Sequence, residues 1–487
     1  MTARLSATQT LPPGVHRPAY DPAAHGPGIV HIGLGAFHKA HQAVYTDDAL
    51  AAAGGDWRII GISPRSATAA AELAPQDHRY TVIARDAAGS TARVIGAIAS
   101  TLSLATNPQA VLKTLIAPTT RIVTLTVTER GYGIDLATGR ADAEHPAIAA
   151  DLLTPEAPTG VAGLLTLALR QRHAQGIPPF TVLSCDNLPQ NGTLVRRLLI
   201  DFATHTAPTF APVLADTVAV PATMVDRITP APTVGTSALA KHHLGLSDHA
   251  AVETEVFRQW VVEDTFPQGR PAWEAGGAIL TRNVAPYETM KLRMLNGAHS
   301  MLAYCGVLLG HPTVRDVMAD PAMARLIARH LDAAARTLAP TPGLDLTDYA
   351  RRLLTRFQNP NLAHQTRQIA RDGSQKMPQR IFAPAEHAAA HGHPLAPFAF
   401  ATAAWLRFTV GRTDDGHPHD LADPLISAPD TALPPQALPP HALIDRVASI
   451  IPTPLQENPA WREAVTTRLK TMLTDGMRAA VEAEAAA

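Results

Sequence analysis

The chain has 487 residues, 46% of them hydrophobic and 17% charged, which is enough for two to four domains of roughly 100–200 residues with sizeable cores. Its 41 Lys and Arg residues nearly balance its 42 Asp and Glu residues, and this balance argues against a nucleic-acid binder with a basic face. Two cysteines exclude a disulfide scaffold and a cysteine-rich metal site.

Neither end carries a recognisable targeting signal. The N-terminus lacks the apolar segment of a secretory signal peptide, and the C-terminus lacks a lipidation motif. No stretch approaches the roughly 18 consecutive apolar residues that a transmembrane helix needs. We therefore expect a soluble, cytoplasmic protein with no nucleic-acid or membrane partner.

The N-terminal part of the chain alternates between strand and helix patterns. Residues 1–27 are rich in Pro and Gly and indicate an irregular arm, and 29–32 are an apolar strand followed by a glycine turn and a helix that ends at Gly54-Gly55. The further elements predicted here are strands over 57–63, 80–86 and 91–98 (a hairpin), 121–129 and 179–187, and a helix over 160–175. This alternation predicts an α/β domain with a largely parallel sheet.

Beyond about residue 286 the patterns become helical. The helices predicted there are 287–309, 321–338, 345–357, 362–372, 396–411 and 460–483, and the Pro- and Asp-containing stretch 412–440 indicates a long surface loop. The expected fold class is therefore α/β: an irregular arm (1–27), a Rossmann-type dinucleotide-binding domain (28–285) and a mostly α-helical substrate-binding and catalytic domain (286–487).

The glycine turn after the first strand suits a dinucleotide. Gly33 would allow a tight turn, and Gly35 would let the backbone approach a pyrophosphate where Ala36 and Phe37 open the helix. His38 replaces the third glycine of the usual fingerprint. The motif alone leaves an ordinary strand–turn–helix corner equally open.

The end of the second strand bears on the choice of coenzyme. An acidic residue is expected there for NAD, yet Ser63 is followed by Pro, Arg65 and Ser66. Arg65 and Ser66 could hold the 2′-phosphate of NADP, and a solvated loop is the alternative. NAD and NADP both remain open.

A lysine-bearing helix carries the main catalytic candidates. On an α-helix, Glu288, Lys291, Asn296 and His299 fall within an arc of roughly 140°, and their flanks are apolar. Burial of such groups is costly unless they pair or do chemistry, although an amphipathic helix with a wet polar face is the simpler explanation. A partly desolvated lysine has a lowered pKa and can act as general acid or base on a carbonyl or alcohol.

The other members of this helix have matching uses. Asn296 can donate a hydrogen bond to a developing alkoxide, His299 can orient the same oxygen, and Glu288 can relay protons to solvent. Asn187, at the end of a predicted strand, is a second candidate donor or else part of a turn. Glu129 also lies at a strand end.

Cationic residues form a further cluster. Arg371, Lys376 and Arg380 lie within ten residues and could grip an anionic substrate group, with a solvated basic loop as the alternative. Asp226 stands beside a strand-like stretch. Because the sequence holds no HExxH motif and no pair of neighbouring cysteine ligands, we predict no metal site.

Together these motifs resemble those of the polyol-specific long-chain dehydrogenases, the mannitol dehydrogenase family, over residues 28–455. The segments that carry the resemblance are GLGAFHKAH, TVTERGY, SCDNLPQNG, TMVDRITP, WVVEDTFPQGRPAW and KLRMLNGAHS. The resemblance implies a metal-independent, NAD(P)-dependent oxidoreductase that is a monomer and acts on a small molecule. In that family's pattern, Lys291 would be the general acid/base, and Asn187 and Asn296 would stabilise the reacting oxygen.

The resemblance also assigns the remaining site residues. His299 and Asp226 would bind substrate hydroxyls, and Glu288 with Glu129 would lie on the proton path. Several stretches look closest to the fructuronate reductase branch, which implies conversion of D-fructuronate to D-mannonate. The carboxylate of such a hexuronate would bind to the cationic cluster. Mannitol 2-dehydrogenase or another hexitol dehydrogenase is the near alternative, and a catalytically silent NAD(P)-binding sensor is the alternative from another class.

Overall fold

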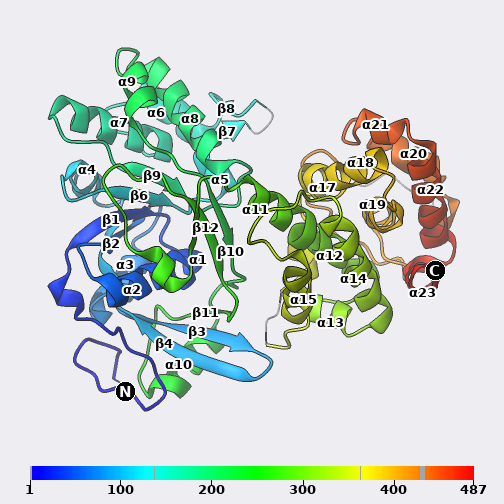
Figure 1. Cartoon of the computed structure of the whole chain (residues 1–487), viewed down its shortest axis with the longest axis horizontal. Helices are drawn as coiled ribbons and strands as arrows, with labels where there is room; N and C mark the ends of the chain where they lie inside the picture. Colours follow the sequence, from blue (N-terminus) through cyan, green and yellow to red (C-terminus); the bar gives the residue numbers. More distant parts are fainter. Residues whose placement is uncertain (1–2, 136–137, 362–363, 428–433) are drawn as a thin grey trace. The chain divides into compact units, whose positions relative to one another are not determined.

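The computed structural model describes residues 3–135, 138–361, 364–427 and 434–487. The chain divides into two compact units, Met1–Ala285 and Pro286–Ala487 (Figure 1). Within the described residues, no helix combines the length and apolar character needed to cross a membrane.

A five-stranded parallel sheet forms the centre of the N-terminal unit. Its strands, in spatial order, are β5 (Ile98–Ser103), β2 (Arg58–Ser63), β1 (Pro27–Ile32), β6 (Ile122–Leu125) and β9 (Thr181–Ser184). The sheet is buried on both faces, as its runs of Ile, Val and Leu require. In β1, Ile29 packs into one core with α2 (Gln42–Ala53), and Val30 packs into another with α7 (Val161–Ala174). The predicted Rossmann-type fold is thereby confirmed.

Smaller sheets complete this unit. The predicted hairpin is confirmed as β3 (Tyr80–Asp86) and β4 (Gly89–Ile95), which are antiparallel, with β11 (Val252–Glu255) parallel to β3. Another sheet holds β10 (Thr223–Asp226), β12 (Gln259–Glu263) and β13 (Ile279–Thr281).

Three predicted strands were too long. The prediction over 179–187 overran both ends of β9 (Thr181–Ser184). The prediction over 91–98 merged the end of β4 with the start of β5. The two strands are separated at Gly96, because its N–H donates to the Asp47 carboxylate instead of to a neighbouring strand. The prediction over 121–129 overran β6, which ends at Leu125, because the backbone N–H groups that follow bond to Asp186. Glu129 therefore begins a short helix, α5 (Glu129–Tyr132).

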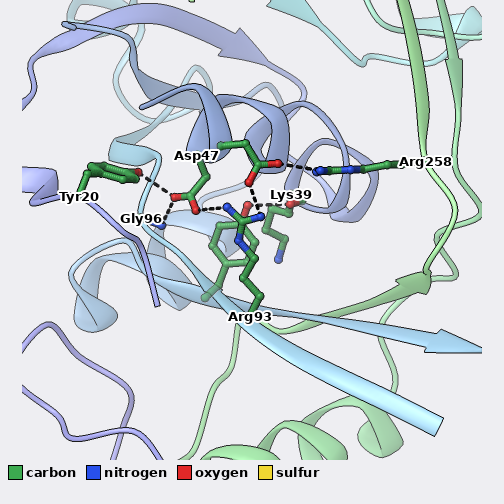
Figure 2. Close-up of polar contacts among 8 residues, drawn as sticks. Tyr20, Lys39, Asp47, Arg93, Gly96 and Arg258 are labelled. Carbon is green, nitrogen blue, oxygen red and sulfur yellow. Dashed lines mark hydrogen bonds and ion pairs between the residues drawn. The ribbon is translucent and has the colours of Figure 1, made fainter. Parts of the chain in front are cut away.

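A partly buried ionic network joins the N-terminal arm to α2 (Figure 2). Asp47 of α2 accepts hydrogen bonds from the Tyr20 hydroxyl at 2.8 Å and from Arg93 Nη2 at 2.6 Å. The neighbouring Asp48 pairs with Arg93 at 2.6 Å and with Arg258 at 2.7 Å. The irregular arm, β4 and the residue just before β12 are thus all tied to α2.

Helices are the regular elements of the C-terminal unit among its described residues. The helices that confirm the sequence predictions are α11 (Ala285–Met290), α12 (Gly297–Leu308), α14 (Pro321–Ala335), α15 (Leu346–Phe357), α19 (Ala396–Phe408), α22 (Pro459–Thr474) and α23 (Gly476–Ala486). Buried Trp405 of α19 and Trp461 of α22 both pack against Phe382, which fixes the centre of this bundle.

The region from 358 to 440 departs from the prediction in part. The helix expected over 362–372 is limited, within its described residues, to α16 (Thr366–Ile369), because the Thr366 hydroxyl and N–H bond back to the segment 311–312; residues 362–363 lie outside the described chain. Three helices were missed, α17 (Gly373–Met377), η5 (Pro378–Phe382) and α18 (Ala383–Ala390). In the described part of 412–440, η6 (Pro435–Ala437) and the first residue of α20 (Pro440–Arg446) are the helical residues, as a loop prediction requires.

Candidate active site

The turn after β1 has a shape that only glycine permits. Gly33 has φ +103°, and a Cβ atom there would lie 2.1 Å from the main-chain oxygen of Thr126. Gly35 is different: it is exposed and extended, and a Cβ atom would meet nothing nearer than the Gly33 oxygen at 3.6 Å. Gly33 therefore shapes the turn, whereas Gly35 leaves open space in front of Ala36 and Phe37, the start of α1 (Ala36–Ala40).

A histidine pair occupies the position of the third fingerprint glycine. The rings of His38 and His31 stack with their centroids 3.4 Å apart, and both side chains are buried. His31 Nδ1 lies 2.8 Å from Thr124 Oγ1 and Nε2 lies 3.0 Å from Thr126 Oγ1, which in turn donates to the Gly33 oxygen at 2.9 Å. Burial lowers the pKa of His31 to about 3, so the ring is neutral.

The strand order places this turn where a dinucleotide would bind. The order reverses between β1 and β6, and ligands of such sheets bind outside the carboxyl ends of the strands at that reversal. The Gly33 turn follows β1, and the segment leading to exposed Glu129 follows β6. Arg65 is exposed after β2. These residues fit a dinucleotide, which needs a close backbone approach and an open turn.

A buried amide joins the ends of β9 and β10. Asn191 Nδ2 donates to the Ser184 and Thr223 oxygens at 3.2 and 3.1 Å, and its Oδ1 accepts the Thr223 N–H at 2.9 Å. Asn187 is exposed in the loop between β9 and α8 (Asn191–Thr206), and Asp226 ends β10. Asn191 therefore fixes the strands that carry both predicted residues. The sequence contained this residue in SCDNLPQNG but gave no reason to separate it from the turn.

Asp226 is 4% exposed and lies near the rings of His41 and Tyr45. Its neighbour Arg227 donates to the main-chain oxygens of Ala40 and Glu255, which ties the end of β10 to the end of α1. The charge of Asp226 acts on His41, whose pKa burial lowers to about 3. Asp226 is thus held within a rigid, largely buried frame.

The lysine helix contains a π turn that the sequence did not reveal. Lys291, 8% exposed, begins the π-helix η4 (Lys291–Asn296), which joins α11 to α12. On an α-helix, Lys291 and Asn296 would point about 140° apart. Because π-helical hydrogen bonds join residues i and i+5, the wide turn stacks them on one side. The arc predicted for an α-helix is therefore wrong in detail, and the two candidates are closer in direction than it implied.

His299 is a buried, neutral imidazole on the same helix run. It is 7% exposed, and its ring packs against Phe357 with centroids 4.8 Å apart and against His364 at 5.0 Å. Its Nε2 has no hydrogen-bond partner among the described residues. Burial, and then the nearby His364 and Arg356 side chains, hold the pKa of His299 well below its usual value. A neutral ring with a spare nitrogen is suited to a substrate hydroxyl, and sequence reasoning overlooked His364 beside it.

The three predicted cations make contacts in different places. Arg380, from the π-helix η5, donates to Ser300 Oγ at 3.2 Å and to the Asn296 oxygen at 3.5 Å, so it lies against the lysine helix. Lys376 Nζ donates to the main-chain oxygen of Arg371 at 2.6 Å, and the Arg371 side chain is exposed.

Glu288 is half-buried in α11, one turn before Lys291. Among the residues that the structure describes, no group of three or more His, Cys, Asp or Glu side chains is arranged to hold a metal ion.

Comparison with known proteins adds the family. The model described as the mannitol dehydrogenase Rossmann domain matches residues 27–275, and the mannitol dehydrogenase C-terminal domain matches residues 283–473. The chain is 40% identical to D-mannonate oxidoreductase of Escherichia coli (strain K12) over 418 residues, 85% of this chain and 86% of that one. It is 41% identical to mannitol 2-dehydrogenase of Cereibacter sphaeroides over 414 residues, 84% and 86% of the two chains.

A solved structure agrees with these matches. The ternary complex of Pseudomonas fluorescens mannitol 2-dehydrogenase with NAD and D-mannitol is similar with a TM-score of 0.86 and 36% identity, over 99% of both chains. The chain therefore belongs to the mannitol dehydrogenase family, whose members are oxidoreductases that act on secondary alcohols of polyols.

Proposed function

We propose that the protein interconverts D-fructuronate and D-mannonate with a nicotinamide coenzyme and without a metal ion. The observation that carries the catalytic part is the π turn, which stacks buried Lys291 with Asn296 on one side of a helix. A lysine so placed can exchange a proton with the substrate oxygen while the amide stabilises charge on the same oxygen. Members of the family that reduce a keto acid or oxidise a hexitol are equally similar in sequence, so the substrate depends on the site itself.

The coenzyme would be held by the Gly33 turn, with its pyrophosphate close to Gly35, Ala36 and Phe37. Once bound, it supplies or accepts the hydride. NAD is favoured by the related ternary complex, which contains it. NADP is favoured by Arg65 in an exposed turn that lacks an acidic residue after Ser63. Comparison of the coenzyme Kd for NADH and NADPH in the wild type and in R65A decides between them.

In the reductive direction, Lys291 would donate a proton to the carbonyl oxygen. Asn296, with Asn187 as a second proposed donor, would stabilise negative charge on that oxygen. The buried neutral ring of His299 and the carboxylate of Asp226 would bind the neighbouring hydroxyls. The residues proposed to return the proton from solvent to the lysine are Glu288 and Glu129.

A carboxylate-bearing substrate is favoured by Arg380. This guanidinium lies against Asn296 and Ser300, and its charge reaches His299. A hexitol offers no anionic group to such a cation, whereas a hexuronate does. Arg371 and Lys376 remain proposed as outer contributors. Mannitol 2-dehydrogenase activity, favoured by the related complex with D-mannitol, is the second candidate.

The test is an absorbance assay of NADH and NADPH oxidation with D-fructuronate and D-fructose. We expect strong turnover of the uronate and its loss in K291M, while K241M, an exposed lysine at the end of α10 (Val234–Leu244), stays active. Preference for D-fructose would assign a hexitol dehydrogenase. Coenzyme binding without turnover of any keto sugar would favour a silent sensor. A monomeric mass in solution is expected from light scattering.

A further inference from the structure

The carboxylate of Asp186 joins two loops at the carboxyl edge of the parallel sheet. Asp186 follows β9, and it accepts hydrogen bonds from the main-chain N–H groups of Val127 at 2.9 Å and Thr128 at 3.2 Å, which follow β6. It also accepts the hydroxyl of Tyr132 at 2.8 Å, and that hydroxyl lies 2.8 Å from Ser184 Oγ. Both carboxylate oxygens are therefore engaged by donors of the segment 127–132.

This segment contains a strained residue. Thr128 has φ +67° and ψ 160°, a backbone conformation that is rare for any residue with a Cβ and especially for a β-branched one. Such a conformation persists only when its surroundings over-determine it. The carboxylate of Asp186 provides that constraint, because it fixes the N–H of Thr128 and of the residue before it.

The two residues that this arrangement positions both belong to the proposed catalytic machinery. Glu129 directly follows strained Thr128, and Asn187 directly follows Asp186. We propose that Asp186 is a positioning residue that sets the proposed oxyanion donor Asn187 and the proposed proton-path carboxylate Glu129 relative to each other. This inference rests on the proposed function for the roles of those two residues.

The D186N variant removes the arrangement while preserving its shape. Each carboxylate oxygen accepts a hydrogen bond from a main-chain N–H. The NH₂ group of asparagine cannot accept such a bond, so one of the two N–H groups would lose its acceptor in either orientation of the amide. We expect kcat to fall by about 10- to 100-fold from misplacement of the site residues. We also expect the amides of Val127 and Thr128 to exchange hydrogen faster, a readout that does not depend on knowing the substrate.

Glycine at position 128 supplies the decisive rescue. Glycine adopts positive φ without strain, so T128G removes the need for the constraint. The kcat of the double variant D186N/T128G should be at least about 3-fold higher than that of D186N. If Asp186 merely stabilised the fold, T128G would give no such increase.

Asp151 provides a matched control. In α6 (Pro146–Leu153) its carboxylate accepts the N–H groups of Thr159 at 2.7 Å and Gly160 at 2.9 Å, and also the Thr159 hydroxyl. D151N should lower the unfolding temperature without changing kcat per folded molecule. Unchanged kcat in D186N, or absence of rescue by T128G, overturns the proposal.

If D186N does not fold, Y132F, which removes one of the three donors, should lower kcat by a smaller factor that T128G again recovers; no recovery would overturn the proposal. If the wild type turns over no keto sugar, the proposed function fails, whereas slow amide exchange at Val127 and Thr128 that accelerates in D186N still supports the constraint. Unchanged exchange in D186N would overturn it.

Discussion

The ring of His38 lies flat against the ring of His31, with 3.4 Å between centroids and 15° between planes. His38 stands where the dinucleotide fingerprint has its third glycine, whose usual purpose is close packing of the helix on the strand. Here the space between β1 and α1 is filled by an imidazole from each element. The two stacked rings thus separate α1 from β1, where a glycine would let the helix pack directly on the strand.

A consensus glycine at this position should therefore weaken the protein. H38G removes a fully buried ring and leaves a cavity beside His31, so we expect a loss of about 2–5 kcal/mol in the free energy of unfolding. H38F keeps a flat ring of similar size and should cost less than about 1.5 kcal/mol. Urea unfolding measures both. Equal stability of H38G and the wild type would contradict the spacer role.

Gly33 and Gly35 should fail in different ways when each is changed to alanine. In G33A, the new Cβ would lie 2.1 Å from the Thr126 oxygen at φ +103°, so we expect a loss of several kcal/mol in stability. In G35A, the Cβ meets only the Gly33 oxygen at 3.6 Å, so stability should stay within about 0.5 kcal/mol of wild type. Thermal unfolding of the two variants tests this contrast.

Coenzyme binding supplies the second half of that comparison. The G35A methyl group would occupy the space proposed for the pyrophosphate, so the coenzyme Kd should rise at least about 10-fold although the fold is intact. Isothermal titration with NADH and NADPH measures it. A G35A protein that binds both as the wild type does would move the coenzyme site away from this turn.

The two aspartates of the ionic network should contribute unequally. The side chain of Asp47 is 1% exposed, and D47N would weaken the hydrogen bonds that its carboxylate accepts from Tyr20, Arg93 and Gly96, at a cost of about 1–3 kcal/mol. The side chain of Asp48 is 20% exposed, and D48N should cost about 1 kcal/mol or less. Chemical denaturation at low and high salt measures both changes. Similar losses in the two variants would show that burial does not distinguish the pairs.

Buried histidines should make the protein sensitive to acid. Burial lowers the pKa of His31 and His41 to about 3 and of His330 and His364 to about 4. Between these values and the unfolded pKa near 6.5, the unfolded chain binds more protons, so stability falls as the pH falls through that window. Each ring contributes at most about 1.4 kcal/mol per pH unit.

Unfolding free energies at several pH values between 7 and 4.5 give the slope, which should be positive with pH throughout. The variant H330F removes one such ring from the helical unit and should reduce proton uptake on unfolding by about one. A flat profile, or a slope that H330F leaves unchanged, would show that these rings are not neutral in the folded protein.

The sequence predicted best what depends on local pattern. Alternating strands and helices gave the Rossmann-type unit, and β1, β2 and β3 lie close to their predicted bounds. The apolar runs in these strands are decisive because a parallel sheet must be buried on both faces. The tight turn at Gly33 was also predicted correctly, since its backbone conformation requires glycine.

What the sequence did not reveal depends on contacts between distant segments. The strand predicted over 121–129 ends at Leu125 because a carboxylate from another strand, Asp186, takes the next two N–H groups. The π turn at Lys291 depends on how the helix packs, since Arg380 binds the Asn296 oxygen and a Cβ atom at Gly297 would lie 3.0 Å from the Arg380 oxygen. The hydrophobic periodicity of a segment carries no information on contacts with distant segments, so the sequence alone favoured an uninterrupted α-helix.

The π turn also acts as a phase shift between α11 and α12. It holds one residue more per turn than an α-helix would, so the direction of every side chain after Asn296 is set by that surplus. All 12 residues of α12 are buried. Loss of a single residue within η4 would hardly change the hydropathy of the segment. It would nevertheless rotate α12 by about 100° relative to its neighbours, or else interrupt the continuous helix between α11 and α12. In this helix the number of residues, as much as their identity, is under constraint.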